Sequence, residues 1–185
     1  MEAFLISTGI VALAEIGDKT QLLALLLAAR FKKPWPIVWG ILVATVLNHA
    51  MAGALGAWVT TLVSPQTLRW VLGGSFIAMA VWMLIPDKLD DGADRPPVRF
   101  GVFGTTVVLF FLAEMGDKTQ VATVMLAARF DAYAAVVAGT TLGMMLANVP
   151  VVLLGERMTR LVPLRLVHVV SAIIFLGLGL FALLG

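Results

Sequence analysis

The chain has no cysteine among its 185 residues, which excludes disulfide bonds and thiolate-held metal sites. Charge is also scarce: Asp, Glu, Lys and Arg make up 13% of the residues, whereas hydrophobic residues make up 61%. Soluble domains carry about 25% charged residues. The mean hydropathy of +1.00 is far above the soluble range. We therefore expect no soluble domain large enough to have a function of its own.

The apolar runs are long enough to cross a bilayer, which takes about 20 residues per helix. The first run has no basic region in front of it and no small-residue cleavage site before Glu15, so we interpret it as a retained span rather than a signal peptide. Run length and breaker residues predict an all-α integral membrane protein with six transmembrane helices, at about residues 3–30, 36–62, 68–86, 100–128, 134–155 and 163–184.

One charged string occurs twice inside these apolar runs, 99 positions apart. It reads EIGDKTQ over residues 15–21 and EMGDKTQ over residues 114–120. The likeness extends further, because residues 13–31 and 112–130 agree at 13 of 19 positions. Ionisable groups inside membrane spans are energetically costly and rarely occur without a function. We therefore interpret the doubled string as a functional site.

The duplication covers both halves of the chain. At the same offset Gly40 matches Gly139 and Phe76 matches Phe175, so each half is a three-helix repeat. The repeats are residues 1–86 and 100–185, and the acidic, proline-containing residues 87–99 are interpreted as a cytoplasmic hinge. Because each repeat has an odd number of spans, the second enters the membrane from the opposite side. Such inverted-topology repeats are typical of secondary transporters, whose sites lie at the repeat interface near the bilayer midplane.

Basic residues outside the strings are divided unequally between the two sides of the membrane. One side has only Arg69 and Arg129, whereas the other has Arg30, Lys32, Lys33, Lys88, Arg95, Arg99, Arg157, Arg160 and Arg165. The positive-inside rule predicts that the richer side is cytoplasmic and that both termini lie outside. These basic residues are therefore interpreted as topology signals, and we expect no nucleic-acid partner.

Each string places oxygen ligands at helical spacing. On a continuous helix Glu15, Asp18 and Gln21 would share one face, because they are three residues apart. The second copy repeats this pattern at Glu114, Asp117 and Gln120. Gly17 and Gly116 lie between the carboxylates, where a helix is easily bent or opened. An opening there would direct backbone carbonyls and helix ends towards a bound ion.

Two strings facing each other would form an all-oxygen cage of four carboxylates and two amides. Oxygen ligands favour calcium, magnesium and manganese over copper(I). Carboxylates crowded in a low dielectric cannot all be ionised without a cation. Protons would then replace the metal, so ion-for-proton antiport follows as a hypothesis, with sodium as an alternative counter-ion. No cofactor is expected beyond the transported ion.

The lysine and threonine of each string have open roles. Lys19 lies four residues after Glu15, so the two could pair on an unbroken helix. Alternatively Lys19 and its repeat partner Lys118 snorkel, or release a carboxylate when the site reorganises. Thr20 and Thr119 either satisfy opened backbone groups or line the ion path.

The second span of each repeat adds polar residues. His49 matches Asn148 at the repeat offset, and Asn48 precedes His49. The histidine is either a proton relay that lines the site or a satisfied polar group in the core. We include all three residues as supporting members of the predicted site.

The string Glu-x-Gly-Asp-Lys-Thr, once per half of a six-span chain, resembles the motif of the calcium/manganese:cation antiporter family. The resemblance covers essentially the whole chain. It implies a multi-pass transporter of the bacterial inner membrane that exports manganese or calcium, in exchange for protons. It also implies that Glu15, Asp18, Glu114 and Asp117 bind the cation. The short bacterial-type chain favours manganese.

Three other classes of protein fit parts of this pattern. Asp18 and Asp117 could form the catalytic pair of an intramembrane hydrolase, but each brings more ligating groups than such a pair requires. An exporter of a small organic or amino-acid substrate is the nearer alternative, and four carboxylates disfavour an anionic substrate. A purely structural membrane subunit is the remaining one. We expect a transporter and not an enzyme.

Overall fold

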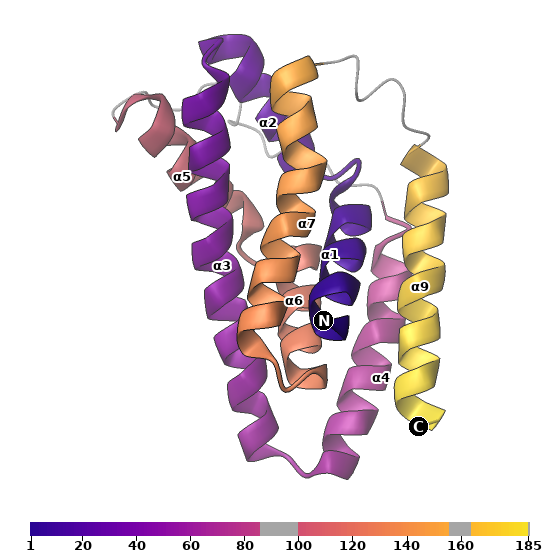
Figure 1. Ribbon diagram of the computed structural model, residues 1–185. Coiled ribbons are helices and arrows are strands. Elements are labelled where there is room, and N and C mark those ends of the chain that lie inside the picture. Colours follow the sequence, from indigo (N-terminus) through magenta and orange to yellow (C-terminus); the bar gives the residue numbers. More distant parts are fainter. Residues whose placement is uncertain (86–99, 156–163, 185) are drawn as a thin grey trace.

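The computed structural model describes residues 1–85, 100–155 and 164–184, and these residues form eight α-helices (Figure 1). The proposed linker at residues 87–99, with its acidic and basic groups, lies outside the described residues. The helices are α1 (Glu2–Glu15), α2 (Lys19–Phe31), α3 (Pro34–Leu62), α4 (Pro65–Trp82), α5 (Gly101–Glu114), α6 (Lys118–Arg129), α7 (Tyr133–Leu154) and α9 (Leu164–Leu184).

The expected all-helical architecture is confirmed, but two of the six expected spans are each divided into two helices. The run at 3–30 becomes α1 and α2, and the run at 100–128 becomes α5 and α6. Both divisions fall within the repeated string. Three helices are long and apolar enough to cross a membrane on their own: α3, α7 and residues 165–184 of α9.

Glycine explains where the chain leaves the helix. Gly17 has a φ of 87° and Gly116 a φ of 76°, values that other residues adopt only with strain. The preceding residues, Ile16 and Met115, are extended. Each break therefore ends one helix at a glutamate and begins the next just after an aspartate. The expectation that the helix opens at these glycines is confirmed.

Helix α7 packs on α1 through glycines that permit close approach. A Cβ added at Gly139 would lie 2.5 Å from the Phe4 carbonyl oxygen, and one at Gly143 would lie 2.6 Å from that of Thr8. The two helices therefore run parallel, and residues near 148 lie at the same height in the bundle as the end of α1. Helix α3 packs in the equivalent way on α5, and also contacts α6 and α7.

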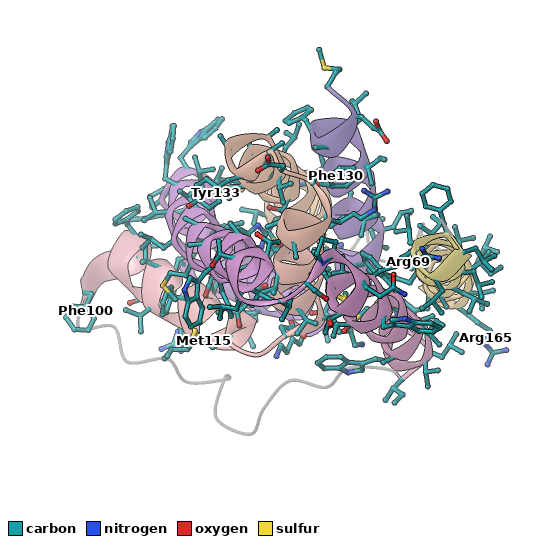
Figure 2. All side chains as sticks on the ribbon, turned by 90° about the horizontal axis from the view of Figure 1, so that it is seen from below. Arg69, Phe100, Met115, Phe130, Tyr133 and Arg165 are labelled. Atoms are coloured by element: carbon teal, nitrogen blue, oxygen red, sulfur yellow. The ribbon has the colours of Figure 1, made fainter. Side chains whose placement is uncertain are left out.

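Helices α4 and α9 form a pair at one side of the molecule (Figure 1). Their Phe76 and Phe175 rings lie with centroids 6.2 Å apart. Arg69 of α4 donates to the Leu183 carbonyl near the end of α9, and Figure 2 shows this arginine beside α9. The pair joins the rest of the bundle through contacts of α4 with α6 and of α9 with α1.

The exterior is apolar and the polar residues are inside, as expected for a protein surrounded by lipid. Trp35, Trp39, Trp58 and Trp70 are each more than half exposed, whereas nineteen polar or charged residues of the described ranges are buried. The ends of α2 and α7 and the starts of α3 and α9 lie at one end of the bundle (Figure 1). The α3–α4 and α6–α7 connections lie towards the other end.

Candidate cation site

The two glutamates of the strings are the last residues of α1 and α5, and both are fully buried. The hydroxyl of Thr20 donates to Glu15 Oε2 over 2.6 Å, and that of Thr119 donates to Glu114 Oε2 over 2.7 Å. Each threonine is in the first turn of the helix after the break. The glutamate of each string is therefore oriented by its own threonine, with the same geometry in both copies.

Carboxylates from the two repeats come together at the breaks. Glu15, Glu114 and Asp117 act on one another electrostatically, and the Thr119 side chain also hydrogen bonds to Glu15. The carboxylates of the two strings are therefore close enough to influence one another. In the described part of the chain, however, no three acidic or histidine side chains are grouped closely enough to hold a metal ion. Binding a cation would require these side chains to move together.

The two aspartates lie at the starts of the second half-helices. Asp18 precedes α2 and Asp117 precedes α6, and both are almost fully buried. Asp117 Oδ1 accepts a hydrogen bond of 2.7 Å from the Lys118 backbone N–H. A helix N-terminus carries partial positive charge, which favours a carboxylate there.

The glutamines stabilise the breaks. The Gln21 side-chain oxygen accepts from the Gly17 N–H over 3.0 Å, and that of Gln120 accepts from the Gly116 N–H over 2.7 Å. The Gln21 amide nitrogen donates to the Ala147 carbonyl of α7. Each glutamine thus satisfies a backbone group that the break leaves without a helical partner. Both glutamines thus hold the breaks in place, and direct contact with the cation stays a prediction for them.

Polar residues of α3 and α7 contact the breaks of the opposite repeat. Asn148 Nδ2 lies 3.3 Å from Glu15 Oε2, and Asn48 Nδ2 donates to the Phe111 carbonyl over 3.0 Å. The Gln120 amide nitrogen donates to Asn48 Oδ1. Both asparagines therefore lie against the breaks, and their supporting roles in the site stay a prediction.

His49 is fully buried, and neither of its ring nitrogens has a hydrogen-bond partner among the described residues. Its height in the bundle follows from packing. A Cβ at Gly40 would touch Thr106 of α5, so His49, nine residues later, comes level with Glu114. The bond from Asn48 to Phe111 agrees with that register. His49 is thus at the position of α3 that corresponds to Asn148 of α7.

The two lysines have different partners. Lys19 Nζ lies 3.5 Å from Asp117 Oδ2 of the other repeat, whereas Lys118 Nζ donates to the Ile85 carbonyl, beyond the end of α4. A Glu15–Lys19 pair within one helix was conceivable for a continuous helix. The break at Gly17 separates these residues into different helices, and Lys19 instead reaches across the repeat interface.

Several site contacts come from backbone carbonyls that sequence reasoning missed, at Ala147, Phe111 and Ile85. Backbone carbonyls carry no side-chain signature, so composition cannot reveal them. Ala147 could have been found from the duplication, because it is the repeat partner of Asn48. The Met115 side chain is half exposed and lies close to the surface in Figure 2, so the candidate site does not enclose it.

An apolar helical bundle with broken helices and buried carboxylates at its centre is the architecture of a membrane carrier for a cation. The family model described as "Divalent cation/proton antiporter GDT1" matches residues 3–91 and 102–185. The chain therefore belongs to the GDT1 family of divalent cation/proton antiporters. The resemblance noted in the sequence is confirmed.

Individual relatives agree with this assignment. The chain is 53% identical over 181 residues to a Vibrio cholerae protein named "Putative manganese exporter", covering 97% of this chain and 90% of that protein. It is 28% identical to GDT1-like protein 3 of rice, covering 95% and 71% of the two chains. A GDT1-like protein of Synechocystis is 26% identical, with 95% and 93% covered. No solved structure matches the chain.

Proposed function

We propose that this protein exports manganese across the bacterial inner membrane in exchange for protons. The observation that carries the proposal is the meeting of buried Glu15, Glu114 and Asp117 from both strings at two helix breaks. Family membership supports divalent-cation/proton antiport, and the name of the Vibrio cholerae relative supports manganese over calcium. The cation is the cargo of the protein and not a resident cofactor.

The proposed ligands are the carboxylates of Glu15, Asp18, Glu114 and Asp117, all of them buried. Oxygen ligands suit manganese and calcium alike. Helix ends assist them, because the C-termini of α1 and α5 carry partial negative charge that attracts a cation. Gln21 and Gln120 are proposed to hold the openings at Gly17 and Gly116 in place, as their hydrogen bonds indicate.

The two kinds of carboxylate lie in different fields. The aspartates are at helix N-termini, where a negative charge is favoured, whereas the glutamates end α1 and α5, where it is disfavoured. We therefore assign the returning protons to Glu15 and Glu114.

We propose that the protein consists of two inverted three-helix repeats. It then has six spans, with each broken span counted as one. The segregation of connections to two ends of the bundle supports this topology (Figure 1). Arg30, Lys32 and Lys33 are then cytoplasmic, because basic residues gather on that side, and both termini face outwards.

The test is manganese flux in proteoliposomes under an imposed pH gradient. We expect Asp117→Asn to abolish manganese flux and the coupled proton movement, because it removes a charge from the site. The matched control is Asp131→Asn, the same chemical change at an exposed residue between α6 and α7, which should leave flux unchanged.

Distinct outcomes separate the alternatives. Manganese flux that persists in Asp117→Asn would remove the string from the mechanism. Flux that follows an imposed sodium gradient but not a proton gradient would change the counter-ion and leave the site intact. Calcium carried in preference to manganese would change the cargo.

A further inference from the structure

Lys19 contacts a carboxylate of the opposite repeat. Its Nζ lies 3.5 Å from Asp117 Oδ2, and its charge also acts on Glu114. Asp117 is almost fully buried, whereas Lys19 is 22% exposed. One ammonium group thus interacts with two of the carboxylates that the proposed function assigns to cation binding.

Charge balance explains why such a contact exists. Leaving a buried carboxylate without a partner costs several kcal/mol, so a carrier without cargo needs a positive charge at this place. A divalent cation bound to Asp117 and Glu114 would supply more charge than the ammonium. It would also repel that ammonium at short range. Lysine and cation therefore compete for the same oxygens.

We propose that Lys19 is a tethered counter-ion: it holds Asp117 in the carrier without cargo, is displaced when the divalent cation binds, and returns as the cation leaves. This inference rests on the proposed function and adds a specific competitor to its site. Competition lowers the affinity for the cation, and the returning ammonium assists its release. Release is the step that an exporter must complete against a concentration gradient.

The second repeat offers a matched comparison within the same molecule. Lys118 is the repeat partner of Lys19, yet its ammonium donates to the Ile85 carbonyl over 3.0 Å. It is also almost fully buried. Lys118 therefore serves as the comparison for loss of a buried lysine of the same motif.

The experiment uses the purified full chain with MnCl₂ as the probe. Manganese affinity is measured by isothermal titration calorimetry for the wild type and for Lys19→Met, Lys19→Gln, Lys19→Arg and Lys118→Met. We expect the Met and Gln variants at position 19 to bind manganese about three- to tenfold more tightly, because an ion pair no longer has to be broken. Their manganese efflux from proteoliposomes should be slower. Lys19→Arg should keep the wild-type affinity.

A merely structural role predicts the opposite sign, namely weaker binding. Unchanged or weaker affinity in both charge-removing variants, with an unfolding temperature equal to that of the wild type, overturns the inference. Equal tightening in Lys118→Met overturns it too, because the effect would then not depend on the contact of Lys19 with Asp117. Lack of manganese binding and flux in the wild type would instead overturn the proposed function.

Discussion

At the break after α1, Asn148 bonds to the glutamate and the lysine crosses to Asp117 of the other repeat. At the break after α5, the residue equivalent to that asparagine is His49, whose ring nitrogens have no hydrogen-bond partner among the described residues, and the lysine bonds to the end of α4. The backbone, the threonine bond and the glutamine bond are nevertheless the same at both breaks. Local sequence therefore sets the shape of each break, and packing sets its partners.

This difference matters for transport, because a carrier must present one site to two sides in turn. In a strictly symmetric pair, α4 and α9 would make matching contacts with both pairs of half-helices. Instead the α4–α9 pair packs on α1 and α6. The unequal lysine contacts occur in the same asymmetric arrangement, so we expect the two copies to respond unequally to some substitutions and equally to others.

The largest expected effect tests the shared part of the comparison. Glu15→Gln and Glu114→Gln should each reduce manganese efflux by more than about 100-fold, because outer-shell changes alone cost about 10- to 100-fold at metal sites. Initial rates in proteoliposomes provide the measurement. If one variant keeps half of the wild-type rate, the two strings do not form a single site.

The threonines should give the next largest effect, again equal in the two copies. Thr20→Val and Thr119→Val remove the hydroxyls that orient the glutamates, and we expect each to weaken manganese binding about tenfold. Serine keeps the hydroxyl, so Thr20→Ser and Thr119→Ser should bind as the wild type does. A calorimetric affinity that valine leaves unchanged would contradict the orienting role.

The glycine breaks should respond through stability. Gly17→Ala and Gly116→Ala should each lower the free energy of unfolding by about 1–2 kcal/mol, because alanine is strained at a positive φ. Gly9→Ala is the control, since Gly9 lies inside α1 with open space where a Cβ would go. Alanine there should be neutral or stabilising. Thermal unfolding in detergent measures the difference, and equal effects at all three positions would contradict the strain.

The smallest expected effect removes a difference between the copies. His49→Asn places the same residue at the equivalent positions of α3 and α7. Calcium prefers oxygen ligands, so losing an imidazole level with Glu114 should reduce the preference for manganese over calcium, by roughly fivefold. Competition between the two ions in flux assays measures it. An unchanged preference would leave His49 as a packing residue.

Much of the fold was predictable from the pattern of apolar residues in the sequence. Runs of apolar residues located α3, α7 and α9 to within two residues, because such runs have to match the thickness of a bilayer. The two divided spans were expected as continuous runs that open at Gly17 and Gly116. Hydropathy averaged over the length of a span does not register such an interruption, because the stretches on either side of the charged string are apolar. The glycine between two carboxylates was the sequence signal for the interruption.

The sequence predicted which residues belong to the candidate site, but it did not predict the contacts that these residues make. The duplicated string identified both glutamates, both aspartates and both glutamines. Spacing on a continuous helix, however, placed Gln21 on the same face as the carboxylates and left a pair of Lys19 with Glu15 open. Once the helix ends at Glu15, those spacings no longer apply. Gln21 then bonds to Gly17 and Ala147 instead.

The sequence by itself determined which residues carry charge into the membrane and where two helices must break, because both properties are local and each occurs twice. Tertiary structure alone decided that Lys19 contacts Asp117 while Lys118 contacts Ile85. Identical strings have identical local preferences, so nothing within them distinguishes the two lysines. Their surroundings do, because the end of α4 lies beside one break and an aspartate of the opposite repeat lies beside the other.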